Sequence, residues 1–126
     1  MIRKFGLAVL FLVLGSVSAL AADFNGKWNA EINAGAGLHK YTYEFHVDGA
    51  KVTGRAVSVV DNKPHGDVQI QDGKVDGDTI SFLEVLDMQG KELKITYSGK
   101  IDGDTIKFTR HVGTFATEDF VATRAK

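Results

Sequence analysis

The sequence predicts an all-β protein, an eight-stranded antiparallel up-and-down barrel arranged as a meander. Apolar and polar residues alternate with a period of two through most of the chain, which is typical of strands with one buried face. A hairpin pattern is also repeated: Gly73–Phe82 reads GKVDGDTISF and Gly99–Phe108 reads GKIDGDTIKF. Asp-Gly between alternating apolar residues indicates a hairpin, because Gly accepts the positive φ of a twist-matched turn.

Eight segments are predicted as strands, and they follow one another with short connections. They span residues 26–32, 40–47, 51–60, 67–75, 79–86, 91–101, 105–112 and 115–124. The alternation is clearest in Tyr41–Val47, Leu93–Tyr97 and Ile106–Phe108. In the last segment Thr117–Asp119 interrupts it, and we expect a bulge there. Sequential strands favour a meander, and closure into a barrel removes exposed edges. A two-sheet sandwich is the alternative.

The N-terminal residues predict an export signal. Two basic residues precede a ten-residue apolar run, and Ala19 and Ala21 supply an Ala-x-Ala cleavage pattern. We therefore expect a signal peptide over 1–21, a single barrel domain over 22–126 and a periplasmic or secreted protein. The alternative is an N-terminal membrane anchor. The apolar run is shorter than the roughly 20 residues that a bilayer core requires, so we expect no stable membrane insertion.

Composition excludes several classes of protein. The chain of 126 residues has no Cys, which excludes a disulfide framework and a lipid-modified cysteine. Its formal net charge is −1 and no basic cluster follows the N-terminal segment, which argues against nucleic acid as a partner. Fourteen Gly and one Pro, with many β-branched and aromatic residues, favour short strands and tight turns.

The spacing of the turn glycines predicts the orientation of the barrel. Gly49, Gly77 and Gly103 are 28 and 26 residues apart, which corresponds to one up-and-down cycle. All three turns should therefore lie at one end, called here the turn end. The opposite end, called here the mouth, should carry the looser links 33–39, 61–66, 87–90 and 112–114. Loops of that kind more often carry function.

Two residues at the ends of the domain carry a resemblance to known barrels. Trp28 follows Gly26 on the first strand and Arg124 ends the last, so the guanidinium should stack on the indole. This pattern resembles the lipocalin and avidin (calycin-like) group. The repeated hairpins and terminal Ala-x-Arg resemble a set of small secreted bacterial barrel proteins of unknown function. The resemblance implies structural roles for Trp28, Arg124, Gly77 and Gly103, and a small cavity.

The repeat also places polar residues on inward faces. Glu84 and Arg110 each lie seven residues beyond a turn glycine, where they interrupt apolar faces at a similar height. Their backbones should be about 10 Å apart with one strand between them, so Arg110 could reach the Glu84 carboxylate. With Tyr97, Tyr43 and Tyr41 they form a candidate ligand-binding set in an apolar cup. The alternative is an ion pair that satisfies only itself in a filled barrel.

Metal binding and catalysis have less support in the sequence. The four histidines (His39, His46, His65 and His111) match no ligand motif and are expected at the surface, so we assign no metal and no cofactor. The aspartates beside the turn glycines are interpreted as turn residues rather than calcium ligands. No nucleophile motif is present, and Glu118 is the only second acid that could face inward. We therefore assign no catalytic residue.

The sequence thus favours an exported barrel that binds a small apolar or amphipathic molecule. Two alternatives remain. The same cavity could serve an isomerase- or cyclase-like enzyme. The barrel could also be a secreted protein-interaction module such as a protease inhibitor, although only Ala22–Asn25 would precede the first strand.

Overall fold

The computed structural model describes residues 23–34 and 37–126, and the predicted signal peptide lies outside them. The strands are β1 (Gly26–Ala34), β2 (Gly37–Asp48), β3 (Lys51–Val60), β4 (Lys63–Gln69), β5 (Gln71–Asp76), β6 (Thr79–Met88), β7 (Lys91–Asp102), β8 (Thr105–Val112) and β9 (Ala116–Arg124). No helix in these two ranges is long and apolar enough to span a membrane.

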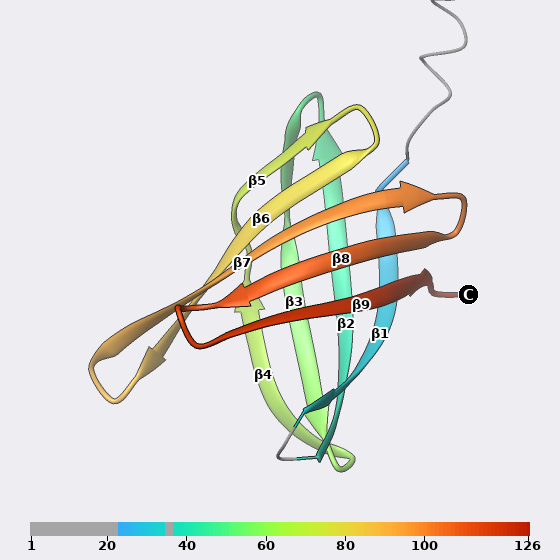
Figure 1. Ribbon diagram of the computed structural model, residues 1–126. Helices are drawn as coiled ribbons and strands as arrows, with labels where there is room; N and C mark the ends of the chain where they lie inside the picture. Colours follow the sequence, from blue (N-terminus) through green and yellow to red (C-terminus); the bar gives the residue numbers. More distant parts are fainter. Residues whose placement is uncertain (1–22, 35–36) are drawn as a thin grey trace, which may run out of the picture.

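The strands form the predicted closed antiparallel barrel. Each pairs with its neighbour in sequence, except that β4 and β5 share the fourth position of the ring, and β1 pairs with β9 to close it. In Figure 1, β1 to β4 run nearly vertically while β6 to β9 cross them, so the barrel is a meander folded into two crossing halves. The fold class expected from the alternation is confirmed.

The predicted fourth strand is broken into two at Ile70. The register of β5 on β6 shifts between Gln71 and Lys74, and Asp72 has a φ of 53°. Ile70 is buried and donates its N–H to the Gly54 carbonyl at 3.0 Å, which ties the break to β3. The expectation of a bulge in the last strand is wrong, because β9 pairs with β8 in continuous register from Ala116 to Thr123.

The turn end has the predicted geometry. Gly49, Gly77 and Gly103 have φ values of 64°, 62° and 62°, in the left-handed region that glycine favours. The expectation of a looser link over 61–66 is wrong, since β3 ends at Val60, β4 begins at Lys63, and a tight turn at Asp61 and Asn62 joins them. These two residues have φ values of 52° and 65°, which Asp and Asn tolerate better than most side chains.

Trp28 and Arg124 close the turn end together. They are direct partners in the β1–β9 pairing, and the guanidinium carbon lies 4.2 Å from the indole centroid. Arg124 also donates to the Asp104 carboxylate at 3.0 Å and to the Asp23 carbonyl at 2.9 Å. The indole N–H donates to the carbonyl of Phe24, whose side chain is buried in the core.

Aromatic side chains fill the interior next to this closure. The cluster contains Trp28, Tyr43, Phe45, Phe82, Tyr97, Phe108 and Phe120, all of them buried. Tyr43 lies at its centre and contacts most of the other rings, and Phe82 stacks on Tyr97 at 4.4 Å. Since dense packing leaves little free space, a binding site inside the barrel has to lie toward the mouth.

The two halves of the barrel separate toward the mouth. β1 and β9 pair only between Trp28–Ala30 and Ala122–Arg124. On the opposite side, β5 pairs with β6 no further than Leu83, and the remainder of β6 pairs only with β7. The barrel is therefore continuous near the turn end and open along two seams near the mouth.

Candidate functional site

The residues expected to face inward do so. Glu84 on β6 is 4% exposed and Arg110 on β8 is 6% exposed. Tyr97 on β7 lies opposite Arg110 in the strand pairing and is buried with them. Period-two alternation explains this placement, because each residue continues the buried face of its strand. These three residues are therefore positioned by the adjacent strands β6, β7 and β8 rather than by loops.

Arg110 forms an ion pair with Glu118, and not with Glu84 as the sequence led us to expect. Arg110 Nε donates to Glu118 Oε1 at 2.7 Å, in a pair whose side chains are 7% and 25% exposed. Glu118 lies directly opposite Arg110 on the adjacent strand β9, whereas Glu84 is two strands away. Arg110 pairs with Glu118 because its side chain has a shorter distance to span to the adjacent strand. The regular register of β9, which the interrupted alternation obscured, is what turns Glu118 toward the interior.

The tyrosines extend this pair into a polar network. Arg110 Nη1 donates to the Tyr97 hydroxyl at 3.2 Å, and the Tyr43 hydroxyl donates to the same oxygen at 3.4 Å. The guanidinium carbon lies 5.2 Å from the Tyr41 ring centroid, a cation–π distance. Tyr41 is only half-buried, so it forms the outer side of the network. Tyr43 belongs to the packed cluster and contacts the network through its hydroxyl.

Glu84 is a member of the network with an unsatisfied hydrogen-bond acceptor. Its Oε1 is buried and has no hydrogen-bond partner among the residues that the structure describes. Burial raises the pKa of the Glu84 carboxyl above its ordinary value, and the Tyr97 hydroxyl and the Arg110 guanidinium offset this only in part. Since an unsatisfied buried polar atom costs about 1–3 kcal/mol, this oxygen is a position where a ligand could add a hydrogen bond.

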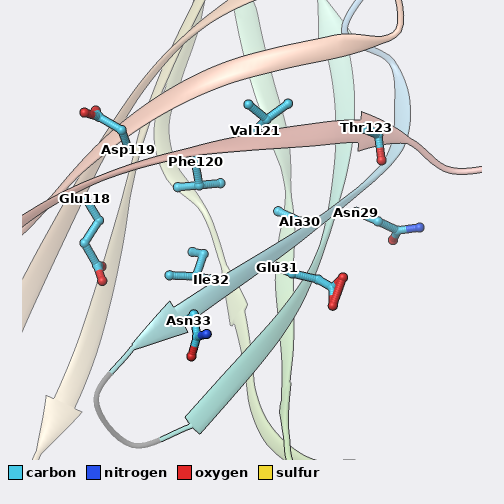
Figure 2. A pocket seen from close by; sticks show the side chains of 10 residues that line it. All are labelled: Asn29, Ala30, Glu31, Ile32, Asn33, Glu118, Asp119, Phe120, Val121 and Thr123. Carbon is cyan, nitrogen blue, oxygen red and sulfur yellow. The ribbon is translucent and has the colours of Figure 1, made fainter.

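A cleft of about 640 Å³ separates β1 from β9 on the mouth side of their pairing. Figure 2 shows Glu118, Phe120 and Ile32 extending into the space between the two strands. Its lining is Asn29, Ala30, Glu31, Ile32, Asn33, Glu118, Asp119, Phe120, Val121 and Thr123. Because Glu118 also bonds to Arg110, the cleft and the interior network share this side chain.

The histidines do not all lie at the surface as expected. His46, His65 and His111 are exposed, but His39 on β2 faces inward beside Tyr41, with ring centroids 6.3 Å apart. Both ring nitrogens of His39 are buried and lack a partner among the described residues. The longer β2 strand explains this, because it extends the inward alternation of Tyr41 to residue 39. In the described part of the chain no three His, Cys, Asp or Glu residues cluster as metal ligands.

A second depression lies at the turn end. It has a volume of about 710 Å³ and is formed where β3 meets β5. Its charged lining residues, which include Lys51, Asp72 and Lys74, are exposed to solvent. It has no buried polar group of the kind that Glu84 and Arg110 provide, so the cleft between β1 and β9 is the better candidate for a specific site.

Comparison with protein-family models, with curated proteins and with solved structures gives no match to this chain. The site is therefore interpreted from its own geometry. That geometry combines a cleft of mixed apolar and polar lining with a small set of buried polar groups, and convergent polar groups beside apolar surface are a feature of small-molecule sites.

Proposed function

We propose that this protein binds a small amphipathic molecule in the mouth half of the barrel, with entry between β1 and β9. The polar end of the molecule meets the network of Arg110, Glu118, Tyr97 and Glu84, and its apolar part lies along the cleft wall. The observation that carries the proposal is that Glu118 both lines the cleft and bonds to Arg110 of the buried network.

The packing of the barrel supports this location. Aromatic rings occupy the interior near the turn end, while the strand pairing ends early at the mouth. Ile32 and Phe120 supply apolar surface inside the cleft, and Glu118 supplies a carboxylate in the same cleft that bonds to Arg110. A molecule with one apolar and one polar end matches this combination.

The same proposal includes a calycin-like relationship and export to the periplasm or outside the cell. The closed antiparallel barrel and the Trp28–Arg124 closure support the relationship. The N-terminal apolar run and the Ala-x-Ala pattern support export. A carrier or scavenger of small molecules is a role that both features suit.

Binding of the neutral fluorescent probe N-phenyl-1-naphthylamine tests the proposal. We expect saturable binding with one probe per chain. Glu31→Trp should weaken it at least tenfold, because Glu31 lines the cleft, is exposed and would place an indole over the entrance. Lys27→Trp is the matched control, since Lys27 is exposed on the same strand outside the cleft.

Equal probe affinity in wild type and Glu31→Trp would contradict entry between β1 and β9. Absence of saturable binding by the wild type would contradict the proposed function itself. Circular dichroism of each variant checks that the barrel is intact.

A further inference from the structure

The interior network contains more acidic than basic groups. Glu84 and Glu118 contribute two carboxyl groups, and Arg110 contributes one guanidinium. Arg110 bonds to Glu118, and Glu84 Oε1 has no partner among the described residues. Two carboxylates and one guanidinium leave the network short of one positive charge when both acids are ionised.

No neighbouring side chain within residues 23–34 and 37–126 supplies this charge. Tyr97, Tyr43 and Tyr41 carry phenolic hydroxyl groups, which supply no positive charge. Both nitrogens of His39 lack any hydrogen-bond or carboxylate partner in the described chain, and its ring packs on Tyr41 and His65 instead. The residues that line the cleft include no Lys or Arg in the part of the chain that the structure describes.

We propose that the ligand of this site is an amphipathic cation, such as an alkylammonium compound, whose positive charge completes the Glu84–Arg110–Glu118 network. This inference rests on the proposed function and narrows it to one class of ligand. The charge enters at Glu118, which is the member of the network that lines the cleft. It pairs with the Glu118 carboxylate and leaves Arg110 to turn toward Glu84, so that each carboxylate has a cationic partner.

The charged residues at the rim of the cleft also favour a cationic ligand. Glu31 and Asp119 line the entrance, both are exposed, and they add negative charge where a ligand enters. Opposite charge along a path of entry attracts a cation and repels an anion. Entry and interior therefore select for the same sign of charge.

Three probes with the same ten-carbon chain test the inference: decylamine, decanol and decanoate. They are cationic, neutral and anionic at pH 7, and displacement of N-phenyl-1-naphthylamine measures their affinities. We expect decylamine to bind at least tenfold more tightly than decanol, and decanoate to bind most weakly. Glu84→Gln should reduce the ratio of decylamine to decanol affinity to about one.

Glu92→Gln is the matched control, because Glu92 is exposed on β7 and does not line the cleft. This variant should keep the wild-type ratio. Decylamine binding no more tightly than decanol, or an unchanged ratio in Glu84→Gln, would overturn the inference while leaving the proposed function in place. If the naphthylamine probe itself does not bind to the wild type, the proposed function is wrong.

Discussion

The identity of the Arg110 partner can be measured by double-mutant cycles. Arg110→Met removes the guanidinium from a pair whose side chains are 7% and 25% exposed. Breaking a buried pair costs about 3–5 kcal/mol, and the partial exposure of Glu118 places the expected loss near 3 kcal/mol. In a cycle with Glu118→Gln we expect a coupling energy of about 2 kcal/mol. In a cycle with Glu84→Gln the coupling energy should be below about 1 kcal/mol, because Glu84 has no direct bond to Arg110.

Urea unfolding at 25 °C, followed by circular dichroism, gives each free energy of unfolding. The matched control is the exposed pair of Arg55 and Asp67, whose side chains are 51% and 53% exposed. A cycle with Arg55→Met and Asp67→Asn should give less than about 1 kcal/mol. A coupling of Arg110 to Glu84 that exceeds its coupling to Glu118 would refute the described network.

Three further predictions concern stability. Glu84→Gln should raise the free energy of unfolding at pH 8, because burial raises the folded-state pKa of Glu84 and ionisation then costs stability. The gain should disappear in urea titrations as the pH falls below the unfolded value of about 4.3, and a gain independent of pH would contradict this cause. Gly54→Ala should destabilise the barrel by more than about 3 kcal/mol in the same assay, because its Cβ would overlap the Glu44 carbonyl oxygen and its φ is 151°. Arg124→Met should cost about 1–2 kcal/mol through the lost indole contact and hydrogen bonds, whereas Lys126→Met at the exposed end should cost nothing measurable.

Much of the fold follows from local sequence features. Period-two alternation assigned the strands, and the turn glycines Gly49, Gly77 and Gly103 gave the orientation of the barrel. The break at Ile70 could not be predicted in this way. It depends on the hydrogen bond to Gly54 from another strand and on a register shift, and neither leaves a local pattern. The tight turn between β3 and β4 was missed because Asp61 and Asn62 adopt positive φ without a glycine signal.

The candidate site was predictable as a set of inward residues but not as a network. Burial of Glu84 and Arg110 followed from their position seven residues beyond a turn glycine. The partner of Arg110 depended on the register of β9, which Thr117–Asp119 made ambiguous in the sequence. The cleft arises where β1 and β9 stop pairing, and this divergence results from the crossing of the two barrel halves rather than from any one residue.

Nuclear magnetic resonance offers the most direct test of binding at the mouth. Amide ¹H–¹⁵N spectra should be recorded while decylamine is added to the protein. We expect saturable shifts in the cleft strands, over Glu31–Asn33 and Glu118–Val121, and in Glu84 and Arg110. Amides of the turn at Gly77 should not move. Saturable shifts confined to the depression between β3 and β5, or no shifts in the cleft strands, would contradict the proposed site.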